Sequence, residues 1–289
     1  MALSTSQRQA LVSPGVLPMA APDAVALLRV VFRRRAGVTF LAEQRGQAPW
    51  RVVRPFQLPD GAALLQLAHV GPGIMAGDRY RLEIVVEDGA AVVLIGASAS
   101  KVHTMPPGLH ACQSVTFTVG EGASLEYYPG LCIPFPSADI SQRVSVDLAA
   151  SARFAMLDTW AAGRVERGER GAFRRISTRT RIAVDGRPVY RDALELSPES
   201  PGIDGHGALE GFQYVLSGIW RPTEDRQARE VSGPGLLMAE GPVEQGRYAR
   251  ALALRGIDLI TLGRGLIQEQ RARWGLAPLS LDRFSSAFS

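Results

Sequence analysis

The stretch RYRLEIVVEDGAAVVLIG, residues 79 to 96, decides the fold. Apolar or aromatic residues occupy every second position from Tyr80 to Val86, while charged residues such as Arg81 and Glu83 lie between them. This period-two alternation predicts a half-buried β-strand. The EDGA segment at 87–90 predicts a turn, because glycine accepts positive φ angles, and AVVLIG at 91–96 predicts a second, short strand.

The same unit recurs along the first two thirds of the chain. Alternating strands are expected at 115–119, 144–148 and 176–184, and turn sequences follow them: GEGA at 120–123, LAASA at 148–152 and DGRP at 185–188. Another short strand follows each turn. Successive turns are about 30 residues apart, which is typical of stacked repeat architectures. The sequence therefore predicts a mainly β protein built as an array of β-hairpins, with Gly89, Gly122 and Gly186 in the hairpin turns.

One helix is expected near the C-terminus, within GIDLITLGRGLIQEQRARW at 256–274. Its basic end contains Arg271 and Arg273, and Gly275 and Pro278 follow as a stop signal. Its apolar stripe consists of Leu259, Ile260, Leu262, Leu266 and Ile267. No abrupt shift in composition marks a domain boundary, so residues 1–289 are expected to form one domain.

Composition and charge are those of an ordinary globular protein, with 46% hydrophobic and 21% charged residues. The formal net charge is +4, and the arginines are spread without aromatic residues between them, which favours ion pairs and protein interfaces over nucleic acid. Residues 1–15 hold no uninterrupted apolar segment, and VALLRVVF at 25–32 is too short to span a bilayer, so a cytoplasmic protein without a membrane span is expected. Cys112 and Cys132 lack CxxC spacing and are expected to be small buried residues.

The segment GPGIMAGDRY at 71–80 is the most site-like part of the chain. Gly71, Gly73 and Gly77 lack the spacing of a dinucleotide fingerprint, a strand rather than a helix follows them, and no lysine completes a P-loop. The chain also lacks the G-x-S-x-G elbow of α/β-hydrolases. These nucleotide-binding and hydrolase motifs are excluded, and what remains is a tight turn that presents Asp78.

Two carboxylates interrupt strands that should be buried: Glu126 in SLEYYP and Asp158 in FAMLDTW. An unpaired buried charge is strongly destabilising. Each carboxylate is therefore either paired with an arginine or in contact with water; the nearby candidates are Arg164, Arg174, Arg175 and Arg191. The second alternative describes a polar conduit or cavity inside a β scaffold, suited to a hard or borderline cation.

Five motifs in a fixed order give a resemblance to a known family. They are GPGIMAGD at 71–78, SASKV at 98–102, LEYYP at 125–129 with PFPSA at 134–138, LDTWAAGR at 157–164 with GE at 168–169, and GRPVYRDAL at 186–194. In this order they resemble the successive motifs of the urease accessory protein family UreD, also called UreH. The motif core covers about residues 50–196, and the weaker matches VALLRV, WRVVRPF and RARW extend it over most of the chain.

The resemblance implies a supercoiled, β-helix-like stack of strands with a few helices, which agrees with the hairpin array. It also implies that the protein is no enzyme but a chaperone and scaffold for urease maturation. Members of the family bind the urease apoprotein and UreF, and UreF recruits the GTPase UreG, which carries nickel. Nickel is thought to pass through an internal tunnel of the UreD-like protein, so Ni²⁺ is a transient cargo and not a tightly bound cofactor.

The resemblance also assigns residues. Asp78, Ser100, Asp158 and Asp192 match positions linked to the nickel path. The motif or structural positions are Gly71, Gly73, Gly77, Lys101, Glu126, Pro129, Gly163, Arg164 and Glu169. Scattered oxygen ligands bind Ni²⁺ weakly and release it, whereas a closed His/Cys cage would trap it, so no tight metal site is expected. The chain departs from the family pattern at Pro72, Ala76 and Gly130, which changes the local path.

Two alternatives stay open on the residues alone. In the first, the chain is a β-solenoid carbohydrate-active enzyme that uses Asp158 and Glu126 as acid and as base or nucleophile. In the second, it is a plain β-repeat interaction module in which Asp158 merely pairs with an arginine. Loss of a glycosidase activity on replacing either carboxylate would support the first alternative. Loss of stability without a separate effect on nickel delivery in Asp158→Ala would support the second.

Overall fold

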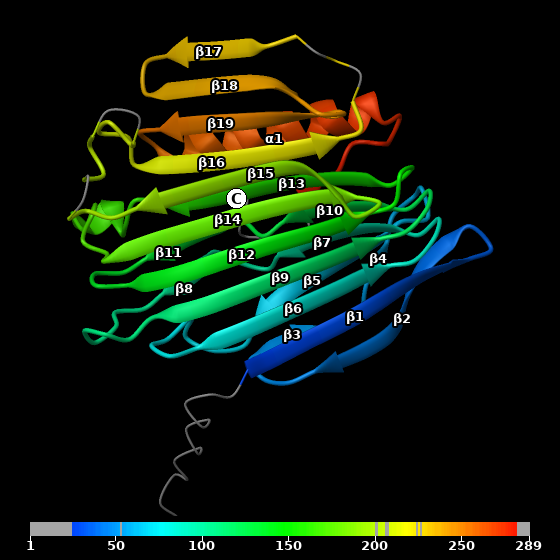
Figure 1. The fold of residues 1–289 in the computed structure, drawn as a ribbon, viewed down its shortest axis with the longest axis horizontal. Helices are drawn as coiled ribbons and strands as arrows, with labels where there is room; N and C mark the ends of the chain where they lie inside the picture. The colour runs from blue at the N-terminus through cyan, green and yellow to red at the C-terminus, as the bar shows by residue number, and fades with distance from the viewer. Residues whose placement is uncertain are drawn as a thin grey trace, which may run out of the picture.

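Two β-sheets face each other in a β-solenoid of about four turns. The computed structural model describes residues 25–52, 54–199, 202–205, 208–223, 225 and 227–281. Within the solenoid the chain alternates between a seven-stranded sheet, called sheet A, and a twelve-stranded sheet, called sheet B. Sheet A lies in front of sheet B in Figure 1. The β-helix-like stack of strands is therefore confirmed.

Sheet A is parallel in its centre, and antiparallel strands close both edges. The parallel strands are β1 (Val25–Arg35), β6 (Arg79–Val86), β9 (Ala111–Val119), β12 (Asp139–Leu148) and β14 (Arg175–Val184). The edge strands are β2 (Val38–Gly46) beside β1 and β15 (Arg187–Leu196) beside β14. Leu82 lies beside Val115, and Val115 beside Val144. Each turn thus adds about 30 residues, as the spacing of the turn sequences predicts.

Sheet B also has a parallel centre, which antiparallel strands extend at both ends. The parallel strands are β5 (Ala63–His69), β7 (Ala91–Gly96), β10 (Ser124–Tyr128) and β13 (Arg153–Ala161). At one end β5 pairs with β3 (Trp50–Val52) and β4 (Phe56–Gln57), and at the other end β13 is followed by β16 (Tyr214–Arg221), β19 (Gly246–Ala253), β18 (Leu236–Val243) and β17 (Arg229–Gly233). The short strands β8 (Ser100–Val102) and β11 (Leu131–Pro134) pair with each other, and the 3-10 helix η1 (Val165–Arg167) follows β13.

The EDGA, GEGA and LAASA turns are corners between the two sheets. At each corner a backbone N–H donates to the carbonyl three residues earlier, as Ala90 does to Glu87 at 3.0 Å. The flanking strands, such as β6 and β7, belong to different sheets and do not pair. The prediction of a hairpin at Gly89 and at Gly122 is therefore wrong, because the strands on the two sides of each turn do not pair with each other. The physical reason is that the apolar faces of both flanking strands are buried against each other across the core, which a two-stranded hairpin cannot offer.

The DGRP turn is the one of the four at which the hairpin prediction is confirmed. Here β14 and β15 pair in antiparallel fashion. Asp185 has φ 48° and Gly186 has φ 77°. Two successive positive φ angles are typical of a type I′ turn, which suits the twist of a hairpin. This hairpin ends the parallel part of sheet A.

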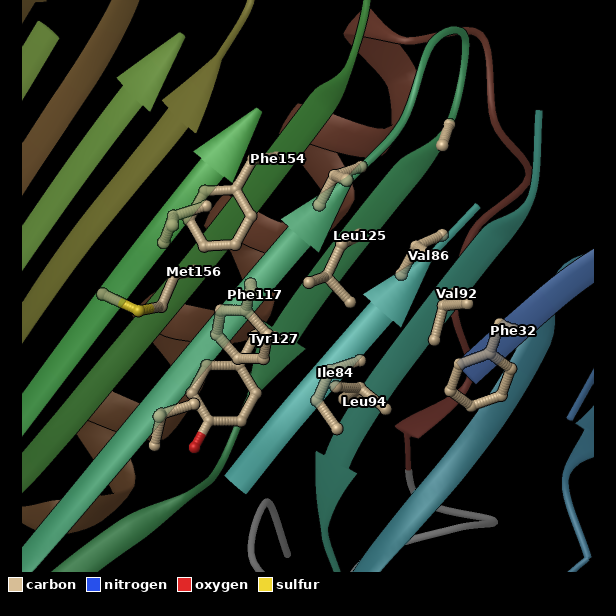
Figure 2. Packing of buried hydrophobic residues seen from close by; sticks show 14 of the residues in the cluster. Phe32, Ile84, Val86, Val92, Leu94, Phe117, Leu125, Tyr127, Phe154 and Met156 are labelled. Carbon is tan, nitrogen blue, oxygen red and sulfur yellow. The ribbon is translucent and has the colours of Figure 1, made fainter. Parts of the chain in front are cut away.

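The main core fills the space between the sheets with the inward-facing apolar side chains of both (Figure 2). Ile84 of β6 and Leu94 of β7 are members of one buried cluster, although a corner separates them in the sequence. Phe117 of β9 meets Tyr127 of β10 edge-on at a ring centroid distance of 4.9 Å. Full burial of such a side chain contributes about 1.5–3 kcal/mol. The alternation in the sequence therefore specifies the stacking of the two sheets.

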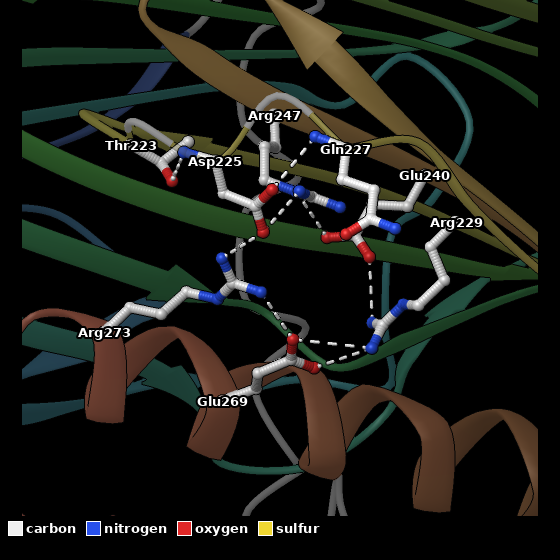
Figure 3. A network of polar contacts seen from close by, with 8 residues as sticks. All are labelled: Thr223, Asp225, Gln227, Arg229, Glu240, Arg247, Glu269 and Arg273. Atoms are coloured by element: carbon white, nitrogen blue, oxygen red, sulfur yellow. Dashed lines mark hydrogen bonds and ion pairs between the residues drawn. The ribbon is translucent and has the colours of Figure 1, made fainter.

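The helix α1 (Gly256–Arg273) confirms the expected C-terminal helix and packs against the outer face of sheet B. Leu259, Leu266 and Ile267 of the predicted apolar stripe are buried there. A ring of alternating arginines and carboxylates ties its last turns to β17, β18 and β19 (Figure 3); the members are Arg247, Glu240, Arg229, Glu269, Arg273 and Asp225. No helix in the described part of the chain is long and apolar enough to cross a membrane.

Candidate functional site

A row of polar side chains crosses the apolar interior of sheet A. Tyr80, Gln113, Gln142 and Thr178 occupy neighbouring positions on β6, β9, β12 and β14. They are in phase with the inward-facing apolar residues of the same strands, because side chains of a strand alternate between its two faces. On one side of the row lies the apolar cluster that includes Phe117, and on the other side lies a second cluster. The interior of the solenoid is therefore divided by polar groups.

Sheet B contributes a matching row. Asp158 of β13 lies beside Ser217 of β16, and Ser217 lies beside Arg250 of β19. Arg250 donates to Ser217 Oγ at 2.6 Å and to Asp192 Oδ1 at 2.7 Å. Asp192 belongs to β15 of sheet A, so this ion pair bridges the two sheets. We call the combined set the polar layer; its members are Tyr80, Gln113, Gln142, Thr178 and Asp192 of sheet A and Asp158, Ser217 and Arg250 of sheet B.

Asp158 is the most buried carboxylate of the polar layer, with 8% of its surface exposed. Gln142 Nε2 at 2.9 Å and Trp160 Nε1 at 3.0 Å both donate to its Oδ2 atom. Burial raises the pKa of Asp158 to about 6, although these two hydrogen bonds and the charge of Arg250 oppose the shift. Asp158 forms no ion pair with any residue that the structure describes. Of the two sequence-based alternatives for this residue, pairing with a nearby arginine is wrong.

Two cavities lie along the polar layer. The larger, of about 360 Å³, lies beside the glycine-rich loop; its lining includes Gly71, Gly73, Ser100 and Lys101. The smaller, of about 30 Å³, is lined by Asp158, Gln142, Gly130 and Cys132 among others, and it exceeds the roughly 10–15 Å³ that one water requires. Four residues line both cavities: Ile74, Ser100, Gln113 and Pro129. Ser100 and Asp158, both predicted path residues, thus line the smaller cavity together, and Ser100 also lines the larger one.

The glycine-rich loop is fixed to β8 by close backbone contact. Gly73 has φ 138°, and a Cβ atom there would lie 2.5 Å from the Lys101 carbonyl oxygen. The next residue, Ile74, donates its N–H to that same oxygen at 2.8 Å. Gly77 also has a positive φ, of 82°. A side chain at Gly73 would force the loop away from Lys101 and from the larger cavity.

Asp78 closes this loop. Its Oδ2 atom accepts a hydrogen bond from the Met75 N–H at 2.6 Å and a further, short one from the Tyr80 hydroxyl. Tyr80 lines the larger cavity, so Asp78 is linked to that cavity by this hydrogen bond and does not itself line it. His69 lines the cavity as well, and burial lowers the pKa of its imidazole. The histidine is therefore neutral near pH 7.

Asp192 lies at the other end of the layer, far along the stack from Asp78. The side chain of Asp192 is 22% exposed and that of Arg250 is 31% exposed. The four predicted path residues therefore occur in the order Asp78, Ser100, Asp158 and Asp192, from the cavity beside the loop to the last turn of the solenoid.

Glu126 is not part of this region. It is buried on the opposite face of sheet B, where Arg271 of α1 donates a short hydrogen bond to Oε1 and Tyr128 donates to Oε2 at 3.0 Å. Arg271 also lies 3.5 Å from Asp60. The prediction that a buried carboxylate pairs with an arginine is confirmed for Glu126, but the partner is Arg271 and none of the nearby arginines.

The remaining motif residues have structural contacts. Arg164 and Glu169 form a two-pronged ion pair that includes an Nη2–Oε1 distance of 2.7 Å, and the Arg164 guanidinium stacks on Phe135 at 4.1 Å. Gly163 has φ 125°, and a Cβ atom there would lie 2.2 Å from the Glu169 carbonyl oxygen. Pro129 lines both cavities, and its carbonyl oxygen lies where a side chain of Gly96 would be.

The sequence analysis missed several members of the polar layer. Gln113 and Gln142 interrupt the inward-facing phase of two strands whose next inward residues are Val115 and Val144. This interruption is a usable signal, because a polar residue in the buried phase must find a partner or water. Arg250 has no comparable signal, since its role depends on β19 lying beside β16.

A β-solenoid with a polar layer between its sheets is the class of protein that the fold and site define. Residues 24–281 match the sequence model of the family described as UreD urease accessory protein. Urease accessory protein UreD 1 of Synechococcus sp. (strain JA-3-3Ab) is 36% identical over 264 residues, which cover 91% of this chain and 97% of the relative. The UreD protein of Deinococcus radiodurans is 33% identical over 265 residues, or 89% of this chain and 94% of the relative.

Urease accessory protein UreH of Helicobacter pylori (strain P12) is 28% identical over 169 residues, or 58% of this chain and 63% of the relative. The chain belongs to the UreD urease accessory protein family. This membership supports a role in urease maturation.

Proposed function

We propose that this protein is a chaperone of urease maturation that binds the urease apoprotein and UreF, reaches the GTPase UreG through UreF, and conveys Ni²⁺ to the urease active site. The observation that carries the proposal is the polar layer, which holds Asp158 and Asp192 between the two sheets. Its larger cavity begins beside the glycine-rich loop, and its far end is the Asp192–Arg250 pair. The layer therefore serves as the route of the metal ion.

The donor groups along this route suit an ion that must leave again. Carboxylate, hydroxyl and amide oxygens are harder and weaker Ni²⁺ ligands than imidazole and thiolate. Cys132 lines the smaller cavity, but burial raises its pKa well above the usual value, so it stays a protonated thiol and a poor ligand. Asp158, with a pKa of about 6, is mostly ionised above pH 7. Each position along the route then offers the ion one or two weak ligands.

The glycosidase alternative is disfavoured by the placement of its two carboxylates. Asp158 faces the interior between the sheets, whereas Glu126 faces α1 on the other side of sheet B. A glycosidase needs both carboxyl groups on one scissile bond, about 5–10 Å apart and facing each other. In addition, Glu126 is already bound by Arg271, which would have to leave before Glu126 could act.

The interaction-module alternative predicts that Asp158 only stabilises the fold. Its expected arginine partner is missing within the described residues, where neutral Gln142 and Trp160 bind the carboxylate instead. A buried carboxylate held by two neutral donors at one oxygen is a costly way to stabilise a strand. This cost favours a role for the charge of Asp158 in the passage of the cation.

The test is the nickel content of urease in a deletion strain complemented with variants. Asp158→Asn keeps an oxygen that accepts from Gln142 and Trp160 but removes the charge, and Asp192→Asn and Asp78→Asn do the same at the other positions. We expect each to lower the nickel bound per urease while the variant still co-purifies with urease and UreF. Asp147→Asn, on an exposed position of β12, is the control and should behave like the wild type.

Two results would contradict the proposal. Normal urease activity and nickel content in the deletion strain would refute a role in maturation. Loss of urease or UreF from the purified complex in the Asp158→Asn strain would make this residue part of the scaffold, and the route would then not include it.

A further inference from the structure

The outer face of sheet A carries a row of arginines. Arg81, Ser114, Arg143 and Arg179 are neighbours in register on β6, β9, β12 and β14. Two residues further along β14, Arg181 lies directly opposite Arg191 of β15. We call Arg81, Arg143, Arg179, Arg181 and Arg191 the arginine row. All five are exposed, and none of the other described elements covers this face of sheet A in Figure 1.

Most of these arginines lack a counter-charge among the residues that the structure describes. Arg81 pairs with Glu83 at 2.9 Å. By contrast, the side chains of Arg143, Arg179, Arg181 and Arg191 form no hydrogen bond or ion pair with any residue that the structure describes. Many other arginines in the described part of the chain are paired, as Arg175 is with Asp139 at 3.0 Å, although a few exposed ones such as Arg51 and Arg54 are not. This face differs in that four unpaired arginines lie together on neighbouring strands.

The arrangement opposes folding. Arg143 lies beside Arg179, and Arg181 beside Arg191, on strands that are about 4.8 Å apart. Like charges directly opposite each other on neighbouring strands destabilise a sheet. A carboxylate in place of one arginine of each pair would remove this repulsion in the isolated protein, and carboxylates of a partner would remove it on binding.

The groove along this face fits carboxylates in its chemistry. Its volume is about 510 Å³, and its lining includes Arg79, Arg81, Arg143, Arg175 and Arg179, several serines and no acidic residue. The planar guanidinium binds a carboxylate through two parallel hydrogen bonds. A single-stranded nucleic acid would instead need exposed aromatic rings on which bases stack. The one aromatic residue of the lining is Tyr80, whose side chain belongs to the interior.

We propose that the outer face of sheet A docks an acidic surface of the urease apoprotein, whose carboxylates pair with the arginine row. This inference rests on the proposed function, which includes the binding of the urease apoprotein. It adds which face of this protein binds urease and which charged groups make the contact. The charged groove places the docked protein on the side of sheet A, opposite to α1 on sheet B.

The test compares the binding of full-length protein variants to the cognate purified urease apoprotein at about 50 mM and 300 mM NaCl. Arg143→Gln combined with Arg179→Gln should weaken binding at low salt by roughly 10- to 100-fold and make it less dependent on salt. The matched control is Arg51→Gln combined with Arg54→Gln, two exposed arginines near the β3 end of sheet B. The control should stay within about threefold of the wild type.

A fold check accompanies the binding experiment. Because the double substitution removes a like-charge pair, its Tm should equal or exceed that of the wild type. A clearly lower Tm would mean that Arg143 and Arg179 stabilise the sheet, and it would overturn the argument from repulsion.

The failures of the two proposals are distinguishable. If the wild type binds the apoprotein and the Arg143/Arg179 variant binds equally well, the docking face is wrong and the proposed function stands. If the wild type itself does not bind the apoprotein, both are wrong. If the variant keeps its affinity for the apoprotein but loses affinity for a single-stranded RNA probe, the face binds nucleic acid and the docking proposal is overturned.

Discussion

Asp158 shows how a single buried carboxylate can be kept without a salt bridge. Two neutral donors, Gln142 and Trp160, bind one of its oxygens, and the charge of Arg250 acts from further away. These contacts do not offset burial, since the pKa of Asp158 is raised from 3.8 to about 6. The carboxylate is thus destabilising in its ionised form, which is the form that can bind a cation.

The raised pKa predicts a pH dependence of stability. A carboxyl group with a higher pKa in the folded state binds more protons folded than unfolded, so the free energy of unfolding falls as pH rises from about 4 to about 6. The full loss, on the order of 3 kcal/mol, is present above pH 7. Asp158→Asn should therefore stabilise the protein at pH 7.5 and have little effect at pH 4.5. Urea unfolding at both pH values checks this, with Asp147→Asn as the exposed control.

An equal effect of Asp158→Asn at pH 7.5 and pH 4.5 would contradict this prediction. In that case the substitution acts through packing or hydrogen bonds, and the ionisation of Asp158 does not contribute to stability.

Asp158 and Glu126 also mark the limit of prediction from the sequence at this scale. Both are acidic residues in apolar strands, and the cost of burial singles them out correctly. Their different fates depend on which face of sheet B each occupies and on what covers that face. Arg271, the partner of Glu126, is 145 residues away, and only the docking of α1 brings it there. No local spacing could have indicated this pair.

At the scale of elements, alternation predicts strands well but not their pairing. The strands on both sides of EDGA are correct, yet they belong to opposite sheets. A corner and a hairpin both need a residue with positive φ, and Gly89 at 67° and Gly186 at 77° serve the two purposes alike. The pairing is decided by where the next repeat places its own strand, which is information beyond the turn.

The helix α1 was predicted correctly, but one of its contacts was not. Its apolar stripe predicts the buried face, but Arg271 in its last turn is buried as well, with 3% of its side chain exposed. The arginine binds Glu126 and also donates through Nε to the Ala277 carbonyl at 2.8 Å. A basic residue that the sequence assigns to the helix end thus fastens α1 to sheet B.

Removing Arg271 should therefore cost much more stability than removing Arg273, which lies two residues further along the helix and belongs to the ring of ion pairs. Arg271→Met leaves Glu126 buried and unpaired, and we expect a loss of about 3–5 kcal/mol in the free energy of unfolding. Arg273→Met, at a side chain that is 33% exposed, should cost about 1 kcal/mol or less. Adding Glu126→Gln to Arg271→Met should recover part of the loss. Urea unfolding of the four proteins measures these differences, and equal losses at both arginines would refute the special role of Arg271.

At the scale of the whole molecule, the polar layer is a product of register. Gln113, Gln142 and Thr178 come from three different repeats, and the parallel pairing of β9, β12 and β14 aligns them. Each polar residue alone is an ordinary exception in a buried strand. Together they run across the strands, so that the layer follows the axis of the solenoid from the larger cavity to the Asp192–Arg250 pair.

If nickel passes along the polar layer, substitutions that obstruct the layer should slow nickel transfer. Ser100→Leu would place a bulky side chain where the two cavities share their lining, and Gln142→Leu would make the wall of the smaller cavity apolar and remove a donor to Asp158. If nickel follows one route, both obstacles lie in series. When each single variant cuts the rate of nickel transfer to about a tenth, the double variant should retain about a twentieth. Independent effects would multiply and leave about a hundredth.

The measurement is the initial rate of nickel incorporation into urease apoprotein in a mixture reconstituted from purified accessory proteins. Thr118→Leu, on an exposed position of β9, controls for the added apolar side chain and should leave the rate unchanged. A double variant at about a hundredth of the wild-type rate would mean that Ser100 and Gln142 act independently, and single variants at the full rate would mean that nickel does not pass between the sheets. A rate near a twentieth would instead identify one path through the solenoid, because only obstacles in series combine their resistances in this way.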